Sequence, residues 1–120
     1  MEFKTNIPIY LQVIQDIKNK IIKEELPLGS KLPSSRELAV LYNINPNTAA
    51  RIYNELEAAG ISYTRRGIGT FIKEDSTLID TLKKELLENV IVEFTEQVAI
   101  LGYSKEEIIN LLDTFYKEHP

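Results

Sequence analysis

The chain has 120 residues, of which 43% are hydrophobic and 27% are charged. This is enough for one domain with a small appendage and too apolar for a disordered protein. The sequence has no cysteine and one histidine, so a disulfide framework, a thiolate metal site and a cysteine nucleophile are excluded. Its apolar runs are short and its N-terminus carries no apolar signal core, and we expect a cytoplasmic protein without a membrane span.

The charge is divided unevenly along the chain. Residues 1–73 contain ten basic and seven acidic residues, a net charge of +3, whereas residues 74–120 contain four and eleven, a net charge of -7. Such asymmetry is typical of a protein in which one part faces a polyanion and the other has a different task. We therefore predict two functional parts, residues 1–73 and residues 74–120.

Three helices are predicted before residue 60. Residues 8–25 have apolar side chains at the three-and-four spacing of an amphipathic helix, and the prolines of residues 26–33 then force a tight connection. Ser34 and Glu37 fit a capping box that opens a second helix, which ends near Tyr42. Asn45 is a good N-cap, and Pro46 suits the first position of a third helix that ends near Ala59.

A β-hairpin and two more helices follow. Residues 61–64 and 70–72 are β-prone and flank the glycine-containing tip at residues 65–69. Residues 78–101 form a long helix with a wide apolar stripe, and Ser104 and Glu107 fit a second capping box that opens a last helix ending near Tyr116. The sequence thus predicts a mainly helical fold, with three helices and a hairpin followed by two helices.

Three helices followed by a hairpin is the order of a winged helix–turn–helix. In that module the third helix enters the major groove of DNA. Helical periodicity places Ala49, Ile52, Tyr53 and Leu56 on its inner face, and its outer face comprises Asn47, Thr48, Arg51, Asn54 and Glu55. Asn, Arg and Thr side chains suit mixed contacts with base edges and phosphates.

Basic residues outside the third helix complete the predicted DNA-binding set. Arg65, Arg66 and Gly67 form the hairpin tip, or wing, which we expect to approach a neighbouring groove. Lys31 and Arg36 are expected to contact phosphates, which fixes register without reading sequence. The alternatives are a solvated hairpin tip and an ordinary polar helix face.

Three segments resemble the DNA-binding module of the GntR family: LPSSRELA at 32–39, NPNT at 45–48 and RGIGTFI at 66–72. The opening PIYLQ at 8–12 is most similar to the YtrA branch of that family, in which two helices used for dimerisation follow the winged domain. The resemblance implies a dimeric bacterial transcription regulator. It also implies DNA contacts from Arg36, from Asn45, Asn47 and Thr48, and from Arg66 and Gly67. Pro46 and Ala50 stand where many members carry arginine, so the resemblance implies no base preference.

The two C-terminal helices carry more apolar surface than a small neighbouring module can cover, which marks an interface. We expect a homodimer whose contacts come from Leu82, Leu86, Val90, Phe94, Val98, Leu101, Leu112 and Phe115. A two-fold axis presents the recognition helices as a pair, so the predicted DNA site is an inverted repeat.

The sequence shows no catalytic constellation. His119 lies next to the C-terminus, and Gly67 and Gly69 lack the further glycine and helix of a phosphate-cradling loop. We therefore expect no enzyme, no metal and no cofactor. The chain is interpreted as an operator-binding regulator, most readily a repressor, for which a small-molecule effector is conceivable but unidentified. The alternative is a winged-helix protein-interaction or assembly module without specific DNA binding.

Overall fold

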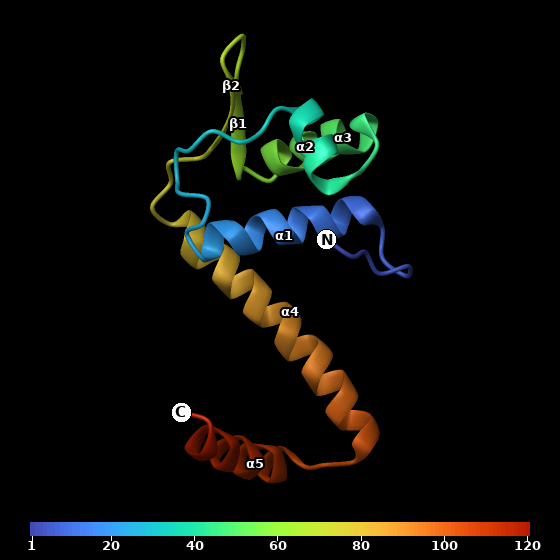
Figure 1. The fold of residues 1–120 in the computed structure, drawn as a ribbon. Coiled ribbons are helices and arrows are strands. Elements are labelled where there is room, and N and C mark those ends of the chain that lie inside the picture. Colours follow the sequence, from blue (N-terminus) through green and yellow to red (C-terminus); the bar gives the residue numbers. More distant parts are fainter. The chain divides into compact units, whose positions relative to one another are not determined.

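The computed structural model describes all residues from Met1 to Pro120 and contains five helices and one two-stranded sheet (Figure 1). The elements are α1 (Ile9–Ile22), α2 (Ser35–Tyr42), α3 (Pro46–Ala58), β1 (Ser62–Arg65), β2 (Gly69–Ile72), α4 (Leu78–Leu101) and α5 (Lys105–Glu118). They occur in the predicted order, and the mainly helical class is confirmed. The chain forms two compact units, Met1–Lys83 and Lys84–Pro120.

Helix α1 buries one side and ends earlier than its sequence pattern predicts. Val13, Ile17 and Ile21 are its buried residues, spaced by one helical turn. The backbone amides of Glu25 and Leu26 both donate to the carbonyl of Lys20, and Glu24, which precedes them, adopts a left-handed φ of 59°. This reversal satisfies carbonyls at the helix end and stops α1 at Ile22.

The caps of α2 and α3 form as the sequence predicts. The amide of Glu37 donates to Ser34 Oγ at 3.1 Å, and the amide of Ser34 donates to Glu37 Oε1 at 3.0 Å. Asn43, with a left-handed φ of 53°, ends α2. The amide of Asn47 donates to Asn45 Oδ1 at 2.8 Å, and Pro46 occupies the start of α3. The two helices are therefore joined by a short turn with a fixed geometry.

The hairpin is bonded to the segment that precedes α2. Strands β1 and β2 pair antiparallel, with Arg65 opposite Gly69 as the last pair before the tip. The amide of Leu32 donates to the carbonyl of Thr70, and the amide of Ile72 donates to the carbonyl of Ser30. Lys31, between these bonds, forms a bridge with Phe71. The wing is thus anchored to the chain that leads into the helix–turn–helix.

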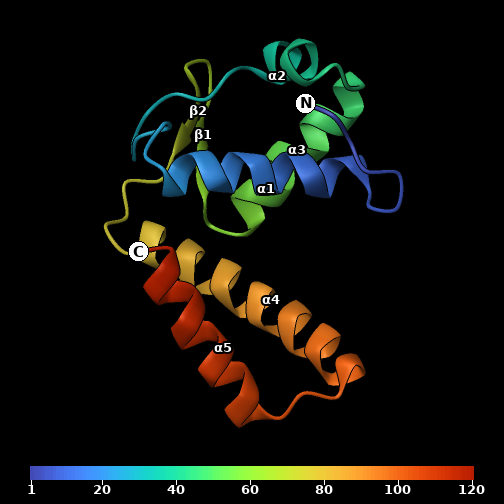
Figure 2. The same ribbon diagram turned by 60° about the horizontal axis from the view of Figure 1, so that its bottom comes forward.

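The first unit has one hydrophobic core. Helix α1 lies across α3 (Figure 2), and the buried hydrophobic residues of α1, α2, α3 and the hairpin belong to a single cluster. Leu78 and Leu82 of α4 are also in this cluster, with 7% and 3% of their surface exposed. The first compact unit therefore extends to Lys83, ten residues beyond the boundary at 73/74 drawn from the sequence.

The second unit has no buried side chain. Between Lys84 and Pro120 every residue is exposed or half-buried. Helices α4 and α5 leave the turn at Gly102 in diverging directions (Figure 1), and the predicted capping box of Ser104 and Glu107 opens α5. The apolar faces of the two helices consequently remain open to solvent in a single chain.

None of the five helices combines the length and the apolar character that crossing a bilayer requires.

Two buried tyrosine hydroxyls connect elements of the first unit. Tyr42 Oη donates to Asp16 Oδ2 at 2.6 Å, and Tyr53 Oη donates to the carbonyl of Pro33. Burial raises the pKa of both hydroxyls well above the ordinary tyrosine value, and the neighbouring carboxylates of Asp16 and Glu37 respectively raise it further. Both groups are therefore neutral in the folded protein far into the alkaline range.

These shifts predict an alkaline loss of stability. In the unfolded chain both hydroxyls lose their protons near pH 10, whereas the folded chain retains them, so the folded state binds more protons above that pH. The stabilisation is complete below about pH 10 and is lost as the pH rises further. We expect the free energy of unfolding in urea to decrease with pH in this range, with a shallower slope for Tyr42→Phe and Tyr53→Phe. An unchanged slope in both variants would contradict the assignment.

Candidate nucleic-acid interface

The outer face of α3 is polar and uncovered. Its inner residues Ala49, Ile52, Tyr53 and Leu56 are buried, as predicted. Asn47 and Asn54 are exposed and Thr48 is half-buried, and no hydrogen bond within the chain involves the side chain of Asn47, Thr48 or Asn54. These donors and acceptors are therefore free to contact a partner.

Asn45 caps α3 through its side-chain oxygen, while its side-chain NH₂ group is free. Its Oδ1 accepts the hydrogen bond from the amide of Asn47, which uses the acceptor half of the side chain. The Nδ2 group makes no hydrogen bond within the chain, and the residue is exposed. A side chain fixed through its oxygen in this way presents two N–H donors at the start of α3, and both phosphates and base edges are able to accept from such donors.

Arg51 is held on two sides. Its guanidinium carbon lies 3.7 Å from the centre of the Tyr10 ring of α1. Its Nε lies 3.9 Å from Glu55 Oε1 one turn further along α3, which is an ion-pair distance but too long for a hydrogen bond. The terminal nitrogens of the guanidinium have no hydrogen-bond partner in the chain, and 56% of the side chain is exposed.

The wing tip carries two arginines with different surroundings. Arg65 lies over the Phe71 ring at 6.0 Å, and that ring stacks on Tyr63 at 5.7 Å. Arg66 is exposed and forms no hydrogen bond, ion pair or ring contact within the chain. Gly67 has a φ of 78°, and a Cβ added there would meet nothing within 4 Å. The turn requires a glycine at this position, and the absence of a side chain leaves the backbone accessible to a large partner.

Lys31 is aligned along the wing by its neighbours. A Cβ at Gly69, whose φ is 146°, would stand 2.6 Å from Lys31 Cε, so the absence of a side chain at Gly69 lets Lys31 lie against the hairpin. A groove of about 350 Å³ runs between the wing and the start of α2 and is lined by Lys31, Ser35, Arg65 and Gly67 among others. Arg36 is exposed at the first turn of α2.

One acidic group lies at this groove. Glu37 also lines it, and the hydrogen bonds from the backbone and hydroxyl of Ser34 hold the pKa of its carboxyl below the ordinary value. Its negative charge is thus committed to capping α2. Lys31 and Arg65 are the cationic residues that line the same groove.

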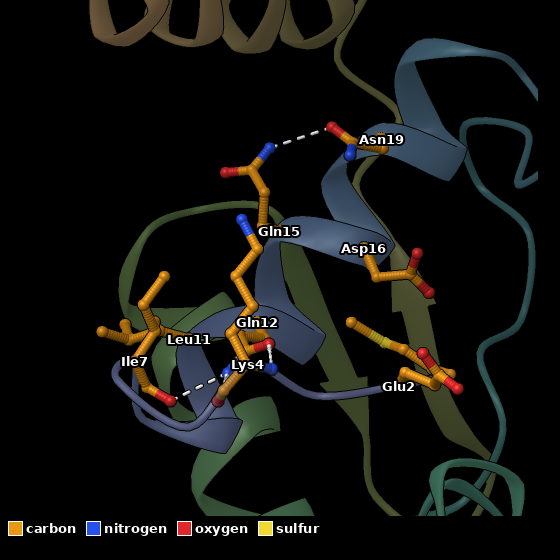
Figure 3. Close-up of a pocket in the computed structure, with 9 residues that line it drawn as sticks. Glu2, Lys4, Ile7, Leu11, Gln12, Gln15, Asp16 and Asn19 are labelled. Atoms are coloured by element: carbon orange, nitrogen blue, oxygen red, sulfur yellow. Dashed lines mark hydrogen bonds between the residues drawn. The ribbon is translucent and has the colours of Figure 1, made fainter. Parts of the chain in front are cut away.

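Further hollows lie elsewhere in the first unit, and one of about 510 Å³ beside α2 is lined by Arg36 and Glu37, together with Pro33, Val40 and Leu41. A pocket of about 330 Å³ lies along α1 (Figure 3), where Gln12 Nε2 donates to the carbonyls of Lys4 and Ile7 and fixes the N-terminal segment on the helix. None of the predicted DNA-binding residues lines this pocket. No three or more His, Cys, Asp or Glu side chains are grouped so that they could hold a metal ion.

The residues predicted for self-association are exposed or half-buried, with the exception of Leu82. Phe94 and Leu112 are exposed to 39% and 41%, and Val90, Leu101 and Phe115 to still larger fractions, while Leu86 and Val98 are half-buried. The prediction that Leu82 contributes to the contact between two copies is corrected, because its side chain is already buried in the core of the first unit. The exposed set also contains large apolar residues that the prediction omitted: Leu87, Ile91, Val92, Ile100, Tyr103, Ile109, Leu111 and Tyr116.

The fold and the free polar surface define a winged helix–turn–helix protein of the class that binds duplex DNA. The family described as "Bacterial regulatory proteins, gntR family" matches residues 9–72. The HTH-type transcriptional regulator YhcF of Bacillus subtilis is 44% identical over 114 residues, which are 95% of this chain and 94% of YhcF. The HTH-type transcriptional repressor YtrA of the same bacterium is 43% identical over 95 residues, 75% of this chain and 73% of YtrA.

Solved structures agree with these relatives. A GntR family transcriptional regulator from Listeria monocytogenes has a TM-score of 0.85 at 36% identity, and the match covers 93% of this chain and 98% of the other. The DNA-binding domain of AraR in complex with operator ORR3 has a TM-score of 0.53 at 28% identity, covering 60% of this chain and 84% of that one. The chain therefore belongs to the GntR family and is a DNA-binding transcriptional regulator.

Proposed function

We propose that this regulator is a homodimeric repressor that binds an inverted-repeat operator. Residues 1–73, with the first turns of α4 as support, act as the DNA-binding part, and the remainder of the chain joins two copies. The observation that carries the proposal is the contrast between the two units. One unit presents polar and cationic side chains without partners, and the other presents apolar helices without a core.

The DNA contacts are assigned by chemistry. The free donors and acceptors of Asn45, Asn47, Thr48 and Arg51 suit the major groove and its flanking phosphates. Arg66 and the open backbone at Gly67 suit a neighbouring groove. Three cationic side chains at the edge of the wing serve as phosphate contacts that set the register of the protein on the duplex. These are Lys31, Arg36 and Arg65.

The dimer is assigned by the exposed apolar surface of the second unit. Large hydrophobic side chains of α4 and α5 are 39% to 86% exposed, and soluble monomers rarely leave a contiguous apolar surface of this kind uncovered. A second copy of the same two helices offers matching apolar faces, and pairing about a two-fold axis buries both sets at once. The acidic residues of this unit keep the assembled helices soluble.

The symmetry of the dimer determines the symmetry of its DNA site. Two copies of α3 related by a two-fold axis read the same bases on opposite strands, so the half-sites form an inverted repeat. Their centres are expected about one helical turn, roughly 10 base pairs, or a multiple of it apart. Occupation of a promoter by such a dimer blocks transcription sterically. The name of YtrA, a transcriptional repressor, supports this direction of control.

Selection of bound sequences from a random duplex pool tests the proposal. We expect the full-length protein to enrich one inverted repeat with a fixed spacing between half-sites. We also expect the logarithm of the association constant for that repeat to decrease steeply with the logarithm of salt concentration, because several phosphates are neutralised. Enrichment of a single asymmetric site would contradict the dimer, and no enrichment at all would contradict sequence-specific binding.

A further inference from the structure

Tyr10 lies outside the helix–turn–helix, yet it touches a residue of the reading helix. It belongs to the first turn of α1 and is half-buried against the hydrophobic core. The Arg51 guanidinium of α3 lies over its ring at 3.7 Å, a separation at which the planar cation stacks on the aromatic face. The crossing of α1 over α3 brings the two residues together (Figure 2).

The stack leaves the hydrogen-bonding edge of Arg51 unused. The ring covers one face of the guanidinium, and Glu55 approaches Nε, the nitrogen nearest the helix. The terminal nitrogens make no hydrogen bond in the chain. These nitrogens are the ones that form the bidentate pair with O6 and N7 of guanine. Both contacts therefore orient the side chain without occupying the groups that recognise a base.

An exposed arginine without such a support moves among many rotamers, and ordering it on binding costs conformational entropy. A ring that holds the guanidinium in one orientation before DNA arrives removes part of this cost. The Tyr10 hydroxyl forms no hydrogen bond in the chain, so the support comes from the ring alone. This separates the stacking role from any polar role of Tyr10.

We infer that Tyr10 is a positioning residue for DNA recognition, and that its ring holds Arg51 in the orientation in which Arg51 contacts a base edge. The inference rests on the proposed function, in which α3 reads the operator. It extends the recognition surface to α1, an element that does not enter the groove itself.

The test compares Tyr10→Leu with Tyr10→Phe in the full-length protein. The measured quantity is the ratio of affinities for the selected operator and for a random duplex of the same length. A stack at a partly exposed site corresponds to a factor of about 2 to 5 in each half-site, and thus about 4 to 25 for a dimer. We expect Tyr10→Leu to lower the ratio by this factor, and Tyr10→Phe to keep it because the ring is retained.

A double-mutant cycle with Arg51→Ala shows whether the effect passes through Arg51. We expect Tyr10→Leu to cause no further decrease of the ratio in the Arg51→Ala background. A purely structural role of Tyr10 gives equal losses on operator and random DNA, or a further decrease in that background, and either result overturns the inference. Thermal melting of each variant reports any loss of folding separately.

The inference and the proposed function fail in different ways. If the wild-type protein selects an operator but Arg51→Ala leaves the affinity ratio unchanged, the inference is overturned and the proposed function stands. If the wild-type protein prefers no duplex over another, the proposed function fails, and the inference fails with it.

Discussion

Replacing Phe94 by glutamate is expected to give a protomer that does not self-associate and binds operator DNA weakly. Phe94 lies in the middle of the apolar face of α4 and is 39% exposed in a single chain, so a partner is needed to cover it. A carboxylate buried there costs several kcal/mol, and a symmetric dimer contains two copies. We therefore expect the dissociation constant of the dimer to rise by about 1000-fold or more.

The loss of the dimer also removes the advantage of binding two half-sites together. Linked binding of this kind typically contributes a factor of about 10² to 10⁴, so the affinity of Phe94→Glu for the inverted repeat should decrease by a comparable factor. Sedimentation velocity measures the first effect, and fluorescence anisotropy with labelled operator measures the second. Asn89→Glu is the matched control, because it adds the same charge at an exposed position on the opposite side of α4. A Phe94→Glu protein that stays dimeric at micromolar concentration would place the interface elsewhere.

Replacing Arg66 by alanine is expected to reduce both the affinity for DNA and its dependence on salt. Arg66 is exposed at the wing tip and has no partner in the chain, so its cation is available to a phosphate. Each neutralised phosphate contributes about 0.9 to the slope of log K against log salt. A dimer carries two wings, and the slope for Arg66→Ala should therefore be smaller by about 2.

Lys105→Ala is the control for this measurement. It removes the same charge at an exposed position of the acidic second unit, and we expect the salt slope to be unchanged. Binding is measured on operator and random duplex from low to physiological salt. An Arg66→Ala slope equal to that of the wild type would show that Arg66 does not contact phosphate, and would leave the phosphate contacts of this edge to Lys31, Arg36 and Arg65.

The elements that follow local rules could be predicted from the sequence. The capping boxes at Ser34 and Ser104, the Asn45 cap and the buried positions of α3 all depend on residues within a turn or two of one another. The exposed apolar faces of α4 and α5 followed from periodicity and from the small size of the neighbouring module. The family was evident from the short motifs around Arg36, Asn45 and Arg66.

Contacts between distant segments could not be predicted in this way. The pairing of residues 30–32 with β2, which places Lys31 against Gly69, depends on how two loops meet in space. The stack of Tyr10 on Arg51 joins residues 41 positions apart. Leu82 continues the apolar stripe of α4 without a break, and only the three-dimensional packing shows that the first unit covers it.

Because the second unit has no core of its own, its folding depends on the concentration of the protein. If two copies pair as proposed, burial of the second unit against its twin is a mass-action process, so its resistance to unfolding increases with protomer concentration. Protomers that have not paired would then expose these helices to proteases, and would be removed in preference to assembled ones. The level of the regulator in the cell would then set the survival of each copy as well as the occupancy of its operator.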